Sequence, residues 1–353
     1  MPAIADVARL AGVSKATASR ALSGRGHVAE ETRLRVVEAA RRIGFVASPA
    51  AASLVTGRTK NVGVVIPFVN RWYFGEVLEG IERALLAAGY DLTLYNVGAS
   101  GPDRDRVFEF FLARKRVDAV VAVGVRLTPA EVEGLELRGK PVVALGVAPA
   151  PGSAALPVLA IDDRAAAALA TEHLLRLGHR RLAHLAGPGA AHEEGSVQAL
   201  RLAGFRDAIA SEPGASAVVR ETEMSLPGGY EAALQLLGHP GERPTGVFCA
   251  CDEIAFGTIM AAGRLGVAVP AELSVVGLDG HEYAPLFGLT TLEQRPAEQG
   301  RLAVERVMAL LGEDAGPDGA PDARADDTDV EADVELPIEL VVRTSTTAAP
   351  AER

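Results

Sequence analysis

The chain has 353 residues, more than one ordinary domain holds, so two or three domains are expected. Hydrophobic residues make up 48% and charged residues 23%, as in a soluble protein with a filled core, and no apolar run is long enough to predict a membrane span. The N-terminus lacks the apolar stretch of a secretory signal, so we expect a cytoplasmic protein. Cys249 and Cys251, separated by one residue in an apolar segment, suit neither a disulfide nor a zinc site.

The formal net charge of −11 is unevenly distributed along the chain. Residues 1–60 hold ten Lys or Arg against four Asp or Glu, which gives +6 and leaves −17 for the remainder. Residues 313–335 alone hold ten acidic residues and one Arg. A basic N-terminal part followed by an acidic body is typical of a DNA-binding module attached to a domain that does not bind DNA.

Three short helices are predicted in residues 4–45, at 4–11, 15–22 and about 30–43. Gly12 can end the first helix in the left-handed conformation, and the hydroxyl of Ser14 can cap the second. The second helix turns Ala18, Ala21 and Leu22 towards the first. Leu34, Val37 and Ala40 lie on one side of the third helix. Residues 1–45 therefore predict a helix-turn-helix head, followed by a small, Ala-rich hinge at 46–60.

From Asn61 onwards, apolar strands alternate with amphipathic helices. Strands are predicted at 61–67, 91–97, 117–124, 141–147, 181–187, 216–221, 245–250, 273–279 and 336–343. Buried strands that alternate with helices predict an α/β fold of parallel sheets with helices on both faces. About nine such units exceed one sheet, so we expect two similar lobes with a cleft between them. Residues 312–334 are rich in Pro, Gly, Asp and Ala and predict an acidic disordered loop.

Several ordered motifs carry a resemblance to a known family. These are AIADVARLAGVSKATASRAL and HVAEETRLRVVEAARRIGF in the head, and LLRLGHRRLAHLAGP, ALRLAGFRDA, CDEIAFGTIMAAGRLGVAVPAELSVVGLDG and GLTTLEQ in the body. Together they resemble the LacI/GalR (lactose-repressor) family over nearly the whole chain except the acidic loop. The resemblance implies a DNA-binding transcription regulator whose periplasmic-binding-protein-like body senses a small molecule. We place the body at 61–344, with lobe 1 at about 61–160 and 294–311, and lobe 2 at about 161–293 and 335–344.

The second helix of such a head enters the major groove of DNA. Its exposed side carries Arg20, which can donate two hydrogen bonds to a guanine, and Ala16, which can pack on a thymine methyl group. The resemblance assigns base reading to Lys15, Ala16 and Arg20, and phosphate contacts to Ser14, Thr17, Ser19 and His27. The alternative interpretation is that Lys15 and Arg20 are ordinary solvated helix charges.

The resemblance also implies a hinge that inserts an apolar side chain into the minor groove, and Leu54 takes that place. The chain departs from its relatives at Ala47, Ser48 and Ala52, which replace the usual Pro, Asn and Arg. Ala3 replaces a Thr that would cap the first helix, and a lost cap costs about 1 kcal/mol. We therefore expect a looser hinge with fewer phosphate contacts.

Ligands of open parallel sheets bind beyond the carboxyl ends of the strands. The aromatic side chains of Trp72, Tyr73 and Phe74 follow the first strand and can stack on the apolar face of a sugar ring. The resemblance assigns effector binding to Arg201 and Asp279, and Asp162, which ends a strand, is a third candidate. An Asp–Arg–Asp set suits vicinal diols, although the same groups could bind a purine or an amino acid.

Simpler structural roles remain open for some of these side chains. Asp162 or Asp163 can cap the helix that starts near Arg164, and Trp72 can serve in lobe packing. Cys251 stands where relatives often have Asn, and Gly146 stands where some have Asp.

We expect a homodimer that binds a pseudo-palindromic double-stranded operator as a repressor of carbohydrate-utilisation genes, relieved by a small sugar. A co-repressor-dependent regulator of a non-sugar metabolite is the main alternative, and a transporter's solute-binding protein is another. The sequence has none of the P-loop, GxGxxG, GxSxG or HExxH patterns, so no enzyme, cofactor or metal site is predicted. No membrane partner is expected.

Overall fold

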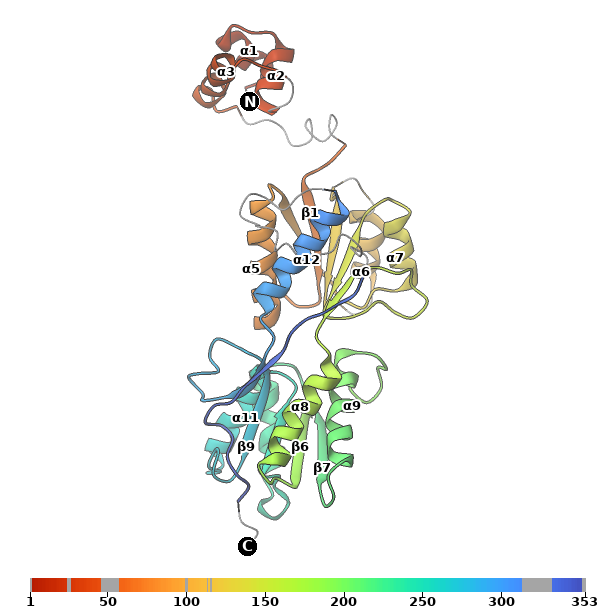
Figure 1. Ribbon diagram of the computed structural model, residues 1–353, viewed down its shortest axis with the longest axis vertical. Coiled ribbons are helices and arrows are strands. Elements are labelled where there is room, and N and C mark those ends of the chain that lie inside the picture. The colour runs from red at the N-terminus through yellow and green to blue at the C-terminus, as the bar shows by residue number, and fades with distance from the viewer. Residues whose placement is uncertain are drawn as a thin grey trace. The chain divides into compact units, whose positions relative to one another are not determined.

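The structure is a computed structural model that describes residues 2–23, 27–45, 57–98, 101–112, 114, 116–312 and 332–350. The chain forms two compact units, residues 1–60 and 61–353 (Figure 1). None of the helices in the described part of the chain is long and apolar enough to cross a membrane. Leu54, most of the predicted hinge and residues 313–331 of the predicted acidic loop lie outside the described residues.

The first unit contains the three predicted helices, α1 (Ile4–Ala11), α2 (Lys15–Ser23) and α3 (Glu30–Arg42). Its small core is built from all three helices and includes Val7, Ala18 and Val36, each fully buried. Gly12 ends α1 with φ 67°, and the Ser14 hydroxyl accepts a hydrogen bond from the Thr17 amide at 3.1 Å. These two turn residues let α2 fold back onto α1 within a few residues.

The prediction of which α3 residues face the core is only partly confirmed. Ala40 is buried, but Leu34 and Val37 are 62% and 46% exposed, and the inward side chains are Val36, Ala39 and Ala40. Residues 36, 39, 40 and 43 form a second stripe at helical spacing, and its small side chains let α1 and α2 approach closely. Apolar periodicity in the sequence did not distinguish the two stripes.

Restoring a cap at the first helix should stabilise the head. Ala3 is the N-cap of α1 and makes no side-chain cap bond, while its amide donates to the Asp6 carboxylate at 2.9 Å. Ala3→Thr adds the missing acceptor and should stabilise α1 by about 1 kcal/mol, whereas Ala3→Val adds similar bulk without the hydroxyl. Hydrogen–deuterium exchange of the α1 peptide in the full chain measures the gain. Equal protection in the two variants would contradict the capping argument.

The second unit is built on two six-stranded sheets with matching strand orders. The first sheet runs β11-β5-β4-β3-β1-β2 and the second runs β12-β10-β9-β8-β6-β7. All neighbouring strands are parallel except β10 and β12, which are antiparallel. The predicted α/β fold with two similar lobes is confirmed, and we call the sheets with their helices lobe 1 and lobe 2.

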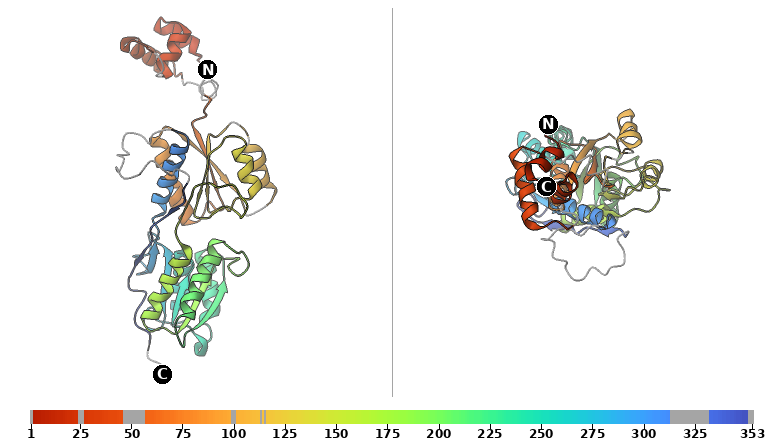
Figure 2. Two further views of the ribbon diagram at one scale, coloured as in Figure 1. Left: turned by 45° about the vertical axis from the view of Figure 1, so that its right-hand side comes forward. Right: turned by 90° about the horizontal axis from the view of Figure 1, so that it is seen from above.

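Lobe 1 has a helical layer on each face of its sheet (Figure 2). Helices α5 and α12 pack on one face, and α6, a π-helical turn and α7 pack on the other. Its elements are β1 (Asn61–Ile66), α5 (Trp72–Ala87), β2 (Asp91–Asn96), α6 (Pro102–Arg106), the π-helical turn Val107–Phe111, β3 (Ala119–Val123), α7 (Pro129–Glu136), β4 (Val142–Leu145), β5 (Val158–Ala160), α12 (Pro296–Leu310) and β11 (Val334–Glu335).

Lobe 2 repeats this arrangement, with α8 and α9 on one face of its sheet and α10 and α11 on the other. Its elements are α8 (Asp163–Arg176), β6 (Arg181–Ala186), α9 (Val197–Ala210), β7 (Ser216–Glu221), α10 (Leu226–Leu237), a 3-10 turn (Pro240–Glu242), β8 (Gly246–Cys249), α11 (Asp252–Arg264), β9 (Ser274–Asp279), β10 (Thr290–Glu293) and β12 (Glu339–Val341).

The chain passes between the lobes after β5, after β10 and after β11. The last passage differs from the prediction. The sequence predicted one strand at 336–343, with residue 334 in the acidic loop and residue 335 in lobe 2. Instead, Val334–Glu335 pairs with β5 in the first sheet, and Glu339–Val341 pairs with β10 in the second. Pro337 separates the two short strands, because proline has no amide to continue a ladder.

A buried histidine in lobe 2 should make stability depend on pH. The ring of His184, on β6, stacks between Phe205 and Phe248, and its Nδ1 donates to the Phe248 carbonyl at 3.0 Å. Burial lowers the pKa of His184 from 6.5 to about 4. The unfolded chain therefore binds more protons between these values, so the stabilisation is complete above pH 6.5 and is lost as the pH falls towards 4.

We expect His184→Phe to reduce the loss of unfolding free energy between pH 7.5 and 5 by about 2 kcal/mol. Urea unfolding at the two pH values measures it, and His192→Gln, at an exposed position after β6, is the control. If wild type and His184→Phe lose the same stability on acidification, another group is responsible.

Candidate functional site

Two regions bring predicted site residues together, and the first is the exposed side of α2. Lys15, Ala16, Ser19 and Arg20 are exposed on this helix, whereas Ala18 and Ala21 point into the core. The α2 face therefore presents two cations and a small apolar side chain beside each other. Such a face can enter the major groove without disturbing the fold.

Ser14 and Thr17, two of the residues predicted to contact phosphates, lie at the start of α2. Ser14 Oγ and Thr17 Oγ1 are hydrogen-bonded to each other at 2.9 Å, and Ser14 also caps the helix. Ser14 and His27 are exposed, and Thr17 is half-buried. A helix N-terminus with hydroxyl groups favours phosphate oxygens, because unpaired amides and the helix dipole both attract negative charge.

The second region lies where the two lobes meet. Tyr73, in the first turn of α5, donates to Gln299 Oε1 at 2.8 Å. Gln299 Nε2 donates to the Gln294 carbonyl at 2.6 Å, and Gln294 Nε2 donates to Asp279 Oδ1 at 2.7 Å. This chain of hydrogen bonds runs in one direction, from lobe 1 through the passage after β10 to the end of β9 in lobe 2.

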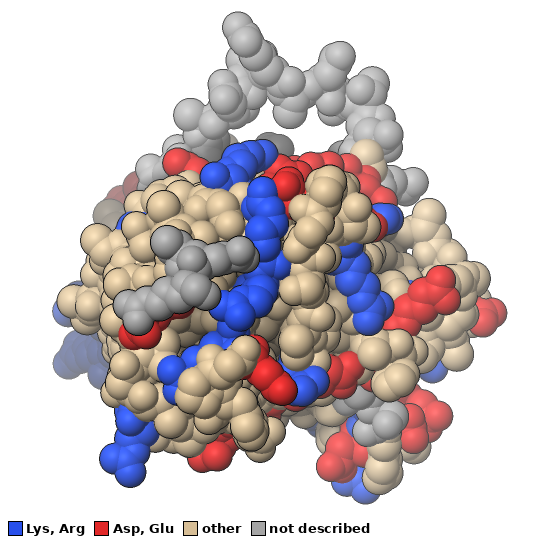
Figure 3. Space-filling model, turned by 90° about the horizontal axis from the view of Figure 1, so that it is seen from below, with Lys and Arg blue, Asp and Glu red and all other residues tan. Residues whose placement is uncertain are grey.

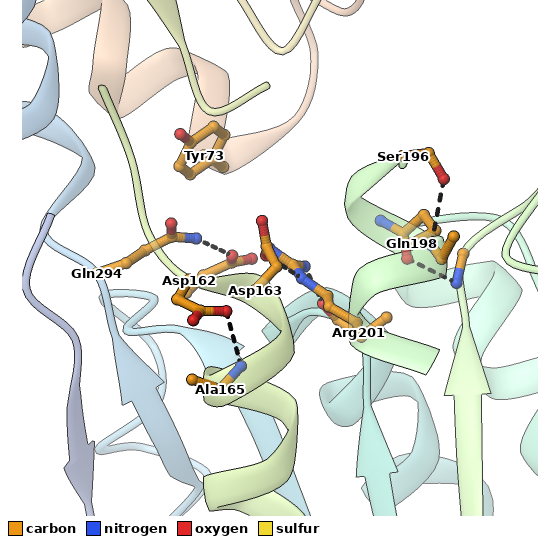
Figure 4. A network of polar contacts seen from close by, with 12 residues as sticks. Tyr73, Asp162, Asp163, Ala165, Ser196, Gln198, Arg201 and Gln294 are labelled. Carbon is orange, nitrogen blue, oxygen red and sulfur yellow. Dashed lines mark hydrogen bonds and ion pairs between the residues drawn. The ribbon is translucent and has the colours of Figure 1, made fainter. Parts of the chain in front are cut away.

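Arg201 lies beside this chain, on α9. Its Nε donates to Asp163 Oδ1 at 2.7 Å and its Nη1 donates to the Ala250 carbonyl at 2.5 Å. Arg201 is 6% exposed and Asp163 is 3% exposed, so the ion pair is shielded from water. In Figure 4, Tyr73 faces the group formed by Asp163, Arg201 and Gln294 from the opposite lobe.

Gly204 allows this ion pair to form. A Cβ atom at Gly204 would lie 2.0 Å from the Arg164 carbonyl oxygen, so only glycine lets α9 approach the first turn of α8 this closely. Arg201 lies one helical turn before Gly204, and Asp163 directly precedes Arg164. The close contact of the two helices therefore places the guanidinium against the carboxylate.

Asp279 is held in an unusual position at the end of β9. Its φ is 141°, a conformation that costs a non-glycine residue about 1–3 kcal/mol. Burial and the nearby Asp252 carboxyl raise the pKa of Asp279 well above its usual range. Asp252 accepts hydrogen bonds from Thr291 Oγ1 at 2.6 Å and from the His281 amide at 2.8 Å. Strain and a raised pKa at a buried carboxyl are features of binding sites.

The remaining predicted effector residues have different surroundings. Asp162 is exposed and accepts a hydrogen bond from the Ala165 amide at 2.9 Å, so its carboxylate caps α8. The indole of Trp72 stacks on His281 of lobe 2 at 4.4 Å between ring centroids. Phe74 packs edge-on against Tyr73 at 5.2 Å. Trp72 therefore contacts the opposite lobe, as its alternative packing role predicts.

Two further polar contacts join the lobes. The Arg71 guanidinium donates to Glu223 at 2.6 Å, and Arg126 donates to the Glu194 carbonyl at 2.7 Å. Cys251 and Cys249 are buried free thiols, and burial raises the pKa of Cys249 to about 12. The Gly146 backbone lies close to the Tyr73 hydroxyl, since a Cβ there would be 3.5 Å away.

A hollow of about 540 Å³ on lobe 2 is a less suitable site. It lies between α8 and α9, and its cations are already paired, Arg176 with Glu172 and Arg180 with Glu212. The face of the molecule seen from below also shows basic side chains next to acidic ones (Figure 3). Exposed ion pairs of this kind are common surface features and carry little binding energy.

Sequence reasoning missed Asp163, Gln294 and Gln299 as members of the inter-lobe group. Asp163 was treated only as a possible cap, although the doubled acid in IDDR was a usable signal, because a helix needs only one capping carboxylate. Gln294 ends the GLTTLEQ motif. Nothing local marks Gln299, which lies in the first turn of α12.

Comparison with known proteins gives family matches to the head and to much of the body. Residues 3–48 match the family described as bacterial regulatory proteins, lacI family, and residues 171–346 match the periplasmic binding protein-like domain. The HTH-type transcriptional repressor CytR of Escherichia coli (strain K12) is 32% identical over 318 residues, which cover 88% of this chain and 89% of the relative.

Two solved structures are similar over almost the whole chain. The lac repressor dimer bound to operator and the anti-inducer ONPF has a TM-score of 0.81 at 26% identity and covers 98% of this chain and 99% of its own. The complex of the transcriptional regulator CelR with cellobiose has a TM-score of 0.64 at 26% identity, with 98% and 100% covered. These relatives are transcriptional regulators rather than enzymes. The chain therefore belongs to the lacI family of bacterial regulatory proteins, with a helix-turn-helix DNA-binding head and a periplasmic-binding-protein-like body.

Proposed function

We propose that the protein is a cytoplasmic, non-enzymatic repressor that binds operator DNA through α2 and releases it when a small sugar binds between the lobes. The observation that carries this proposal is the buried Arg201–Asp163 pair beside Asp279, opposite Tyr73 of the other lobe. Arginine and carboxylates set together recognise hydroxyl groups through charge-assisted hydrogen bonds. The CelR relative, in complex with cellobiose, supports a carbohydrate effector.

In this proposal, Lys15, Ala16 and Arg20 read base edges, while Ser14, Thr17, Ser19 and His27 contact phosphates. Phosphate contacts set the register of the head on the duplex, and base contacts supply the sequence preference. Leu54 would insert into the minor groove. Two copies of the chain would bind the two halves of a pseudo-palindromic operator, as expected for a symmetric dimer.

The effector would act by changing how the lobes meet. Arg201, Asp279, Tyr73 and Phe74 would contact the ligand, with Trp72 and Asp162 at the edge of the site. A ligand that bridges the lobes stabilises one arrangement of them, and its affinity is then coupled to operator affinity in both directions. Induction requires that the ligand favours the arrangement with weaker DNA binding.

An electrophoretic mobility shift assay tests the proposal. The full-length protein should shift DNA from upstream of its own gene more strongly than random duplex of the same length. A screen of sugars for thermal stabilisation identifies ligands, and each hit should weaken the shift. A ligand that strengthens the shift would support the co-repressor alternative, and equal affinity for all duplexes would contradict the regulator itself.

A further inference from the structure

The charge balance around Arg201 restricts the chemistry of its ligand. The Arg201 guanidinium and the Asp163 carboxylate are joined at 2.7 Å, with 7% and 4% of their side chains exposed. Opposite charges so close and so shielded neutralise each other much more effectively than a surface pair does. The exposed pair of Arg164 and Asp207, also at 2.7 Å, shows the contrast, because its side chains are 59% and 52% exposed.

Asp279 adds a second carboxyl to the same surroundings. Its charge acts on both Arg201 and the Tyr73 phenol. When Asp279 is ionised, the group formed by Arg201, Asp163 and Asp279 has a net charge of −1. When Asp279 is protonated, as its raised pKa favours, the net charge is zero. Burial raises the pKa of Asp163 too, while the adjacent Arg201 guanidinium favours its ionised form. With Asp163 ionised, neither state of Asp279 leaves a positive charge for a phosphate or a carboxylate.

The group formed by Arg201, Asp163 and Asp279 can still form hydrogen bonds with a ligand. Arg201 Nη2 and Asp279 Oδ2 have no hydrogen-bond partner among the residues that the structure describes. Arg201 Nη2 is a donor, and Asp279 Oδ2 accepts when the carboxyl is ionised and donates when it is protonated. Both states match hydroxyl groups, which donate and accept. The Tyr73 and Phe74 rings lie on the lobe 1 side and offer apolar surface.

We propose that Asp163 is a specificity-determining residue that cancels the charge of Arg201 and so selects an uncharged polyhydroxyl effector over its phosphate ester or its acid. This inference rests on the proposed function, in which the effector binds at this inter-lobe group. Asp163 does not need to hold Arg201 in place alone, because the Ala250 carbonyl also accepts a hydrogen bond from the guanidinium. The effect of the Asp163 charge can therefore be tested separately from its role in holding the Arg201 side chain.

Inorganic phosphate is the probe that distinguishes the effect of the Asp163 charge from its role in holding Arg201 in place. Asp163→Asn retains an oxygen acceptor for Arg201 and removes the negative charge, which leaves the guanidinium uncompensated. In the full-length protein at constant ionic strength, this variant should bind phosphate at least about tenfold more tightly than wild type, by calorimetry or thermal shift. Asp207→Asn removes the same charge at the exposed pair and should behave as wild type. The gain should disappear in the double variant Asp163→Asn, Arg201→Gln.

The proposal is overturned if Asp163→Asn binds phosphate no more tightly than wild type does. A second measurement uses only the wild-type protein, so it remains informative if Asp163→Asn folds poorly. Free sugars and nucleosides are compared with their phosphate esters on wild type, and any ester that stabilises the protein more than its uncharged counterpart also overturns it. Operator binding is followed separately in the same samples, so a failure to bind DNA counts against the proposed function and leaves the charge result intact.

Discussion

Replacing Arg20 by Ala is expected to abolish most of the preference for operator over random duplex while leaving weak, salt-sensitive binding. Arg20 is exposed on α2, where a guanidinium can donate two hydrogen bonds to one guanine. Loss of such a contact costs about 1–3 kcal/mol, or about fivefold to more than a hundredfold in affinity for the operator. Affinity for random duplex should change little beyond the loss of one positive charge. Mobility shift titrations with both duplexes at two salt concentrations measure the two effects.

Arg9→Ala is the matched control for this experiment. Arg9 lies on α1 and pairs with Asp6 at 2.6 Å, so its removal changes the charge of the head equally without touching the α2 face. It should lower affinity for both duplexes to a similar, small extent. If Arg20→Ala keeps the wild-type preference, or if Arg9→Ala loses as much of it, Arg20 is not a base-reading residue.

Arg201→Ala should erase the response to the effector and also lower the unfolding free energy by about 3–5 kcal/mol, because it leaves the Asp163 carboxylate buried without its partner. The sequence alone predicted only the first effect, since the burial of the pair was not known. Operator affinity of the folded protein should remain near wild type. Urea unfolding measures the stability, and mobility shifts with and without a sugar from the thermal screen measure the response.

Arg164→Ala provides the comparison, because it breaks an ion pair of the same length at the protein surface. Its cost should be about 0–1 kcal/mol, as for other exposed pairs. Adding Asp163→Asn to Arg201→Ala should recover part of the lost stability without restoring the response. The assignment of Arg201 is wrong if Arg201→Ala responds normally to the effector, and the buried-charge argument is wrong if it unfolds like Arg164→Ala.

Local patterns in the chain predicted the head closely. The bounds of α1 agree with the expectation, and α2 and α3 agree to within one residue. Caps, a left-handed glycine and helical spacing depend only on residues a few positions apart, which explains this agreement. The two-lobed α/β body was also predictable, because strands buried on both faces are continuous apolar runs.

Other features depend on contacts between distant parts of the chain. Leu34 and Val37 belong to an apolar stripe that the head leaves exposed, and the choice between stripes depended on how closely α1 and α2 pack on α3. The segment around Pro337 reads as one strand, yet its two halves belong to different sheets. The partners of each half come from residues more than forty positions away.

The amino-acid sequence alone was sufficient for the family resemblance, the helix-turn-helix head and the identity of Arg201 and Asp279 as candidate effector residues. Only the tertiary structure paired Arg201 with Asp163, linked Tyr73 to Asp279 through Gln299 and Gln294, and showed that Asp162 caps α8. The physical reason is that the charge and hydrogen-bonding capacity of a buried group depend on which distant side chains surround it. These surroundings are set by the fold. The close contact at Gly204 places α9 against α8, and three passages of the chain connect the lobes.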